Sequence, residues 1–314
     1  MKKSSYPFRL AVVLCAALLA VAGPAAAETA HPAALMAEYG HGVRAGINDL
    51  VRKALLQTQL LAAEPELIQA VTAGETIPLV DLANLYIMNS PVLDVVAFFD
   101  EEGGILAMNT QDSQGKLLAK EKIDEIMRKR FVERGVIADC LTNKAVDSLV
   151  EFQTHCDFTP ELYNSSGLSV ALSSPIVDPD TGAKVGVIST RLNFQRVLDV
   201  VEGRRFSDAK ADVFLVSDAG EYFSEPIQSG LVEPPVAPEV IRALSGPFEY
   251  TDFQNIFAED RDDYLTLVQI NIREMVPGKN LYILVRAPKD AVEEAAAMGM
   301  RPADKTVKQK REVS

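Results

Sequence analysis

Histidines and acidic clusters are the residues that would bind a metal ion, and their spacing does not favour a site. His31, His41 and His155 are the only histidines, and the first two are ten residues apart, so they cannot share a helix face as an i, i+4 pair would. His155 adjoins Cys156, but no second Cys/His pair completes a tetrahedral set. The acidic run 259–263 lacks the spaced oxygen ligands and central glycine of a calcium loop. We therefore expect no metal and no cofactor.

Nucleophilic or phosphate chemistry has no sequence support either. The chain contains no G-x-S-x-G motif, no P-loop, no G-x-G-x-x-G and no C-x-x-C-H for covalent haem. An exported enzyme is thus the weakest of three functional hypotheses, and we expect that the protein is not an enzyme.

The first 27 residues have the layout of a secretory signal. Three basic residues flank the start of an apolar run at 10–22, and Ala25-Ala26-Ala27 offers a small-residue cleavage site. The run is too short to cross a hydrocarbon core of ~30 Å comfortably, although an uncleaved anchor is the alternative. No later stretch reaches 18 apolar residues. We expect cleavage after Ala27 and a soluble periplasmic protein.

Two cysteines, Cys140 and Cys156, remain after the predicted cleavage. An even pair in an oxidising compartment favours a disulfide, which would stabilise the fold by roughly 3 kcal/mol through loop closure in the unfolded chain. The alternative is two separate buried thiols.

The charge balance bears on partners. The 314 residues include 31 Lys and Arg against 44 Asp and Glu, a formal charge of -13. A nucleic-acid-binding protein needs a basic face to displace condensed counterions, so we expect no nucleic-acid partner. The hydrophobic share of 48% and charged share of 24% are those of a folded globular chain, and the length suggests about two domains.

The elements that would position a site change in kind near residue 90. Before it, apolar residues recur near the 3.6-residue period from 43 to 61. After it, β-prone segments alternate with turns, as in the hairpin formed by 92–99 and 105–108. Regular β–α alternation is absent, which argues against a doubly wound sheet. We expect an α+β fold with a signal peptide at 1–27, a long helical N-terminal segment at 28–90, two modules with antiparallel sheets at 91–205 and 206–292, and a charged tail at 293–314.

Three segments in this order resemble the double-Cache, PAS-like family of extracellular sensor domains. They are the strand pair with S-x-P-I-x-D, T-G and V-G-V at 173–187, the segment 214–220 and the segment 281–288. The resemblance implies a small-molecule pocket in the first, membrane-distal module and a membrane-proximal second module. Family members usually lie between two transmembrane helices, whereas this sequence predicts a free-standing periplasmic form. Such a form would present a ligand to a membrane receptor or kinase, or modulate that partner.

The resemblance also implies ligand-binding residues. Amino-acid-binding members carry R-x-W-[YF], and here Arg128 matches the arginine, Phe131 matches the second aromatic residue and Arg130 replaces the tryptophan. The aspartate that takes the ligand amine in those members is Arg191 here. Because arginine forks suit carboxylates and repel ammonium groups, the expected ligand is a small anionic metabolite, a mono- or dicarboxylate. The alternatives are a solvated helix face for Arg128 and a surface ion pair for Arg191.

Four further residues, Phe99, Phe152, Tyr163 and Ser173, lie on segments that wall the pocket in this family, although each also suits a core or loop position. The competing hypothesis is a non-enzymatic interaction protein. Its long helix, residues 44–61, would pack against a partner or a second copy to form a homodimer, and it would bind no ligand.

Overall fold

The computed structural model describes residues 32–129, 135–143, 146–202, 204–205, 211–245, 255–260, 262–298 and 303–304. The predicted signal peptide and most of the predicted charged tail lie outside this set. Within it, no helix is both long and apolar enough to cross a membrane.

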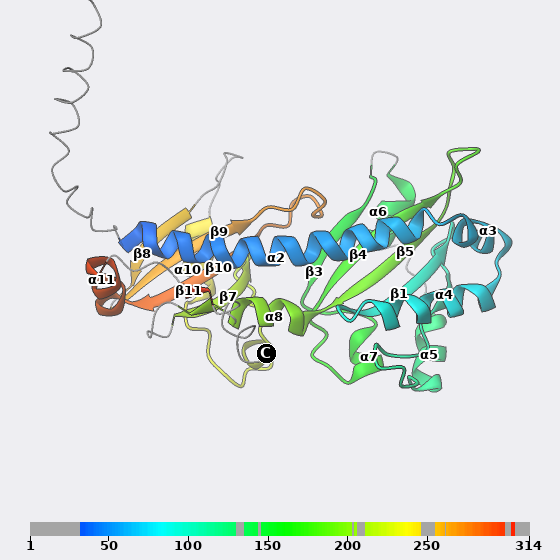
Figure 1. Cartoon of the computed structure of the whole chain (residues 1–314). Coiled ribbons are helices and arrows are strands. Elements are labelled where there is room, and N and C mark those ends of the chain that lie inside the picture. Colours follow the sequence, from blue (N-terminus) through cyan, green and yellow to red (C-terminus); the bar gives the residue numbers. More distant parts are fainter. Residues whose placement is uncertain are drawn as a thin grey trace, which may run out of the picture.

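One long helix, α2 (Pro32–Ala62), runs along both halves of the molecule (Figure 1). Val43, Ile47, Val51 and Ala54 form part of its buried face, at the spacing that places side chains on one side of a helix. Two short helices, α3 (Pro65–Ala73) and α4 (Thr76–Asn89), follow it. The N-terminal segment is therefore helical, and its buried face joins the two sheets described next.

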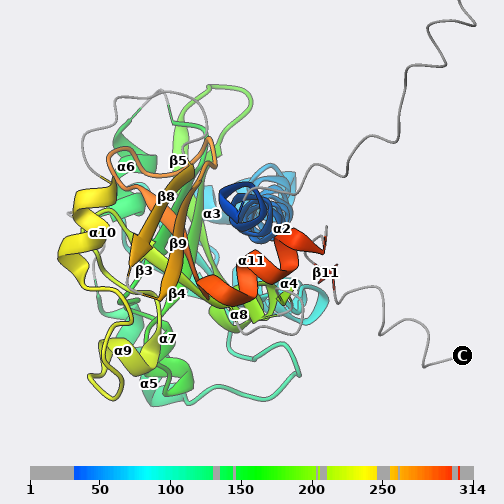
Figure 2. The same cartoon turned by 90° about the vertical axis from the view of Figure 1, so that its left-hand side faces the viewer.

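The first module is built on a five-stranded antiparallel sheet with the order β2-β1-β5-β4-β3. One face packs against α2, α3 and α4, and short helices cover the other face (Figure 2). The strands are β1 (Leu93–Asp100), β2 (Ile105–Met108), β3 (Leu149–Gln153), β4 (Ser169–Val177) and β5 (Lys184–Asn193), and the covering helices are α5 (Lys120–Met127), α6 (Gly135–Thr142) and α7 (Thr159–Tyr163).

The second module is built on a four-stranded antiparallel sheet with the order β7-β10-β9-β8. Helix α8 (Phe194–Glu202) leads from β5 toward it. Its strands are β7 (Asp212–Ser217), β8 (Asn255–Asp260), β9 (Asp263–Ile270) and β10 (Leu281–Pro288), its helices are α9 (Glu225–Gln228), α10 (Pro238–Ser245) and α11 (Lys289–Ala297), and the short strands β6 (Arg204–Arg205) and β11 (Ala303–Asp304) pair with each other.

The two modules also touch without α2. The segment between β9 and β10 reaches the edge strand β3, where the Val150 N–H donates to the Glu274 carbonyl at 2.7 Å and the Val276 N–H donates to the Val150 carbonyl at 3.0 Å. Lys279 forms an ion pair with Glu151 beside these bonds. The predicted α+β fold, with a long N-terminal helix and two antiparallel sheets, is confirmed.

Candidate functional site

Arg191 is a buried cation in the first module. It lies on β5 with 4% of its surface exposed, and its guanidinium carbon is 4.8 Å from the centre of the Phe158 ring. Its Nη1 donates to Ser189 Oγ at 2.6 Å and to the Thr190 carbonyl at 3.1 Å. Its Nε is buried without a hydrogen-bond partner. The side chain is thus held in place with one donor left unused.

No carboxylate of the described residues forms an ion pair with this charge. Burial alone would raise the pKa of the Cys156 thiol, but the Arg191 guanidinium, together with backbone hydrogen bonds from Thr159 and Phe158, holds that pKa below its ordinary value. A buried cation without a counter-charge is costly, so this position favours an anion.

Serine hydroxyls extend the polar surface around Arg191. Ser173 on β4 faces Ser189 on β5 in the sheet register, and their Oγ atoms are 2.7 Å apart. Ser189 therefore links Ser173 to the guanidinium. Phe99 contacts the same region, because its ring meets the Phe158 ring edge-on with 6.5 Å between centroids. This face of the sheet combines a cation, hydroxyl groups and aromatic rings.

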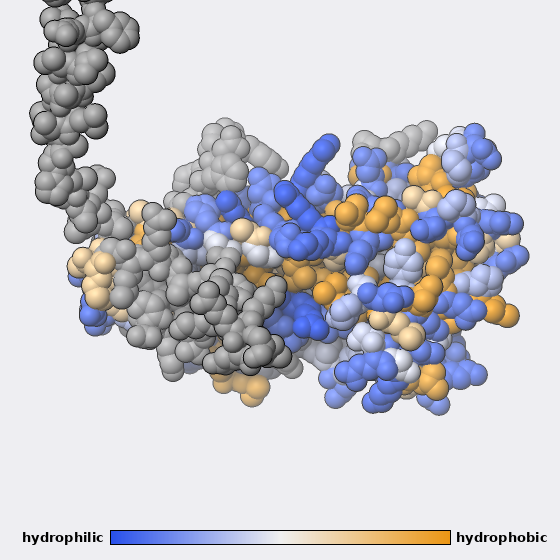
Figure 3. All heavy atoms as spheres, viewed as in Figure 1, coloured by the Kyte–Doolittle hydropathy of each residue, from blue (hydrophilic) through white to orange (hydrophobic). Residues whose placement is uncertain are grey.

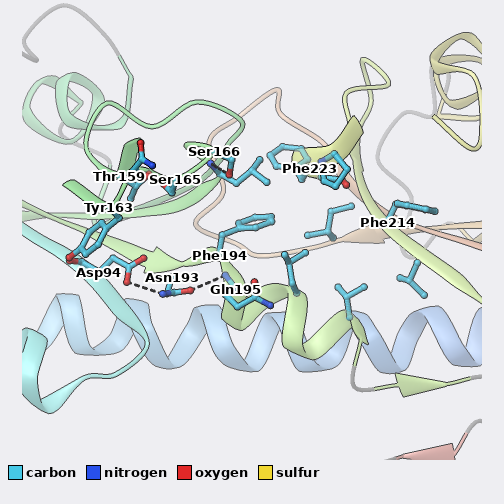
Figure 4. A pocket seen from close by; sticks show the side chains of 18 residues that line it. Asp94, Thr159, Tyr163, Ser165, Ser166, Asn193, Phe194, Gln195, Phe214 and Phe223 are labelled. Atoms are coloured by element: carbon cyan, nitrogen blue, oxygen red, sulfur yellow. Dashed lines mark hydrogen bonds between the residues drawn. The ribbon is translucent and has the colours of Figure 1, made fainter. Parts of the chain in front are cut away.

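A separate cavity of about 590 Å³ lies between the two modules. We call it the intermodule cavity. Figure 4 shows Asp94, Tyr163 and Asn193 at one end and the aromatic residues Phe214 and Phe223 toward the other. Its lining comes from the first module, from α8 and from the start of the second module. A ligand of this size would touch both modules.

Asp94 is the charged residue of that lining. Its Oδ1 accepts a hydrogen bond from Asn193 Nδ2 at 2.9 Å, and its backbone carbonyl accepts one from the Tyr163 hydroxyl at 2.5 Å. Burial raises the pKa of Asp94 to about 6, although the Asn193 hydrogen bond and the nearby Arg196 guanidinium act in the opposite direction. Burial likewise raises the pKa of Tyr163.

Comparison with known proteins rests on structure. No protein-family model matches the chain, and no curated protein does. Three solved structures share its architecture, and one is a domain of a sensory box/GGDEF family protein from Vibrio parahaemolyticus, with a TM-score of 0.58, 12% identity, and coverage of 83% of this chain and 99% of that one. The ligand-binding domain of the Pseudomonas fluorescens chemoreceptor CtaA in complex with L-isoleucine has a TM-score of 0.54 and 14% identity, and the match covers 84% of this chain and 94% of that one. The ligand-binding domain of the Pseudomonas aeruginosa amino acid chemoreceptor PctC in complex with GABA has a TM-score of 0.51 and 16% identity, and the match covers 79% of this chain and 95% of that one. The chain has the double-Cache fold. The family resemblance predicted from the sequence is thereby confirmed at the level of the fold.

The double-Cache pocket residues expected from the sequence separate into groups. Arg191, Ser173 and Phe99 come together on one face of the first sheet. Tyr163 lies beside them on α7 and lines the intermodule cavity. Phe152 is placed on the opposite face, where it packs edge-on against Phe223 of the second module with 6.4 Å between ring centroids. In the sheet register Phe152 lies in one row with Val170 and Leu192, and Leu192 is the strand neighbour of Arg191. Because neighbours along a strand point to opposite faces, Phe152 is separated from Arg191 by the sheet.

Of the three matched residues of the predicted basic motif, only Arg128 lies within the described part of the chain. Arg128 follows the last residue of α5 and is exposed to solvent, which matches the alternative of a solvated helix face. Arg130 and Phe131 lie outside the described residues.

The predicted disulfide is not shown by this structure, in which Cys140 and Cys156 are both free and buried. Each is fixed by its own surroundings. Cys140 lies in the buried face of α6, while the Cys156 backbone N–H donates to Gly167 and its Sγ accepts from the Phe158 N–H. The alternative of two separate buried thiols describes the molecule.

Sequence reasoning missed Asp94 and Asn193. They stand at the start of β1 and the end of β5, and the pairing of these strands shifts between Leu93 and Val95. Such a bulge changes the direction in which a side chain points. The sequence does show an aspartate at the start of a mostly apolar strand, which could have marked Asp94 as a candidate. The bulge that sets the direction of its side chain is not visible in the sequence.

Proposed function

We propose that this protein is a periplasmic small-molecule sensor whose first module binds a small carboxylate at Arg191. The observation that supports the proposal most directly is the buried guanidinium, which has no acidic partner among the described residues and an unused Nε donor. It belongs to a fold shared with ligand-binding domains of chemoreceptors.

The surroundings of Arg191 suit a carboxylate with a short apolar part. A planar guanidinium matches the geometry of a carboxylate and forms strong charge-assisted hydrogen bonds. One of the Ser173 and Ser189 hydroxyls donates to the other, which leaves the second hydroxyl as a further donor, and Phe99 and Phe158 offer apolar contact. The CtaA and PctC ligand-binding domains were solved in complex with L-isoleucine and GABA, and both of these compounds contain a carboxylate.

Signal transfer would require a partner. In this proposal the protein presents its ligand to a membrane receptor or kinase, or modulates that protein. The contact between the modules at β3 offers a route by which a change in the first module can reach the second.

Calorimetric titration with short mono- and dicarboxylates such as propionate and succinate tests the carboxylate site. The Arg191→Gln variant should bind the best ligand at least about tenfold more weakly than the wild type, since a hydrogen bond to a charged group contributes roughly 1.5–3 kcal/mol. The variant removes an unpaired buried charge, so it should remain folded. Arg128→Gln, which changes an exposed arginine of the same module, is the matched control and should retain the wild-type affinity.

Two outcomes would contradict the proposal. One is unchanged affinity in Arg191→Gln. The other is the absence of any rise in melting temperature with carboxylates in a thermal screen, since a ligand at 100 times its Kd should stabilise the folded state by about 2.7 kcal/mol.

Helix-mediated association is a second candidate function, supported by exposed apolar side chains on α2. Leu56 and Leu60 are 55% and 58% exposed and lie one helical turn apart. Figure 3 shows apolar side chains on the face of the half of the molecule that holds the first module. Light scattering across a range of protein concentrations tests this candidate: Leu60→Glu should shift a dimer to monomer, and a wild-type protein that stays monomeric throughout would exclude the homodimer.

A further inference from the structure

We propose that the intermodule cavity is a second binding site, and that it takes a small organic ammonium ion with an apolar substituent. This site uses other residues than Arg191 and selects the opposite charge. It therefore extends the proposed function without depending on the carboxylate ligand.

The ionic end of the cavity is the Asp94 carboxylate. Its Oδ1 is occupied by Asn193 Nδ2, while its Oδ2 accepts no hydrogen bond from any described residue. Figure 4 shows Asp94 at the edge of the cavity with one oxygen joined to Asn193. The free oxygen is an acceptor that a ligand N–H can reach.

The side-chain amide of Asn193 is oriented by the helix that follows it, and this orientation determines which amide atom faces Asp94. Its Oδ1 accepts the Gln195 N–H at 2.9 Å and so caps the start of α8. The opposite end of the amide must then be the NH₂ group, which donates to Asp94. The carboxylate is therefore held in one position, with its second oxygen left for a ligand.

The far end of the cavity is apolar. Phe194 and Phe223 are stacked with 6.4 Å between centroids and 24° between ring planes. Leu198 on α8 and Val213 and Leu215 on β7 complete this wall. Aromatic faces attract cations as well as apolar groups, so the wall suits the substituent of an organic ammonium ion.

Size and charge argue against other occupants. A cavity of about 590 Å³ is in the range of small-molecule sites and far larger than one ion or water needs. Asp94 is the one charged side chain among the described residues that line it, so the lining offers an anion no cationic partner. A hard metal ion needs several oxygen ligands, and no group of three or more His, Cys, Asp or Glu in the described part of the chain could hold one.

Calorimetric titration of the purified protein in a buffer free of carboxylates and amines tests this site. The probes are 2-phenylethylammonium chloride and its uncharged analogue 2-phenylethanol. The ammonium ion should bind about tenfold or more tightly than the alcohol, because a charge-assisted hydrogen bond contributes more than a neutral one. Asp94→Asn keeps the acceptor for Asn193 but removes the charge, and should bring the two affinities to within about threefold of each other.

Asp124→Asn provides the matched control, since it removes the same charge from an exposed position on α5 and should leave the preference unchanged. Equal affinity of the wild type for the two probes, or a full ammonium preference in Asp94→Asn, would overturn the proposal. The comparison of probes needs no variant, so it decides even if Asp94→Asn does not fold. Because the titration contains no carboxylate, its result is independent of the Arg191 site.

Discussion

Two charges of the first module, the buried Arg191 and the half-buried Asp94, are only partly satisfied by the protein itself. Arg191 has an aromatic ring and a serine hydroxyl in place of a counter-charge. Asp94 has one amide donor and an open second oxygen. Each arrangement leaves a donor or an acceptor for a ligand, and the two sites proposed above would select opposite charges.

The raised pKa of Asp94 predicts a pH-dependent stability difference. Its pKa is about 6 in the folded protein against an ordinary 3.8, so the folded state holds the proton more tightly. The stability that this provides is fully present below about pH 4 and is lost as the pH rises through about 6. Asp94→Asn should therefore gain stability relative to the wild type between pH 4 and pH 7, measured by urea unfolding.

Arg196 and the Tyr163 hydroxyl lie near Asp94. Both are the same in the wild type and in Asp94→Asn, so the difference in stability between these two proteins reports on Asp94. The exposed Asp124→Asn variant should show no comparable trend. A constant difference between Asp94→Asn and the wild type from pH 4 to pH 7 would contradict the prediction.

Sequence reasoning found Arg191 because a family pattern assigned its position after the V-G-V strand. The same pattern also selected Arg128, which is exposed, since spacing along a helix does not say where the helix ends. It selected Phe152, whose direction depends on the strand register, and β3 turns that ring to the core. The family pattern therefore predicted which residue types belong near the site, but it did not predict the direction in which each side chain points.

At the scale of elements, α2 can lie close to the second sheet because of Gly40. A β-carbon there would be 2.5 Å from Val268 Cγ2 on β9, and Val268 is fully buried. Helix and sheet therefore approach each other more closely than a side chain on the helix would permit.

Gly40→Ala should lower the melting temperature by several degrees. Overpacking in a core costs about 1–3 kcal/mol, which exceeds the ~1 kcal/mol that alanine gains over glycine in a helix. Gly46→Ala is the comparison: its β-carbon would lie 2.6 Å from Val200 Cγ1, but Val200 on α8 is half-buried and can move aside more easily than the fully buried Val268. A Gly40→Ala variant as stable as the wild type would show that α2 can shift away from β9 without cost.

Element types were largely predictable, and the packing around the site was not. The expected hairpin at 92–99 and 105–108 matches β1 (Leu93–Asp100) and β2 (Ile105–Met108), because turn residues and apolar runs are local signals. The position of the short α7 helix against β5 depends on contacts between residues distant in sequence. Those contacts bring Phe158 over Arg191, and no local pattern records them.

At the scale of the whole molecule, the ion pair between Lys279 and Glu151 helps to hold the modules together. Glu151 is nearly buried, with 9% of its side chain exposed, whereas Lys279 is 59% exposed. Lys279→Gln should lower the free energy of unfolding by about 1 kcal/mol or more and speed amide exchange at Val150 and Val276, because it leaves a buried carboxylate without its cation.

Lys53→Gln is the control. Its partner Asp49 is 64% exposed, and exposed pairs contribute about 0–1 kcal/mol. Equal effects of the two substitutions in urea unfolding would show that the contact between the modules does not depend on this charge.

The segment that joins the modules also covers an edge. β3 ends the five-stranded sheet, and an uncovered edge strand offers free backbone groups to any other chain. Here the Val150 N–H donates to the Glu274 carbonyl, and the Val150 carbonyl accepts from the Val276 N–H. Separation of the modules would uncover that edge, so conditions that separate them should also promote strand-to-strand aggregation of the protein.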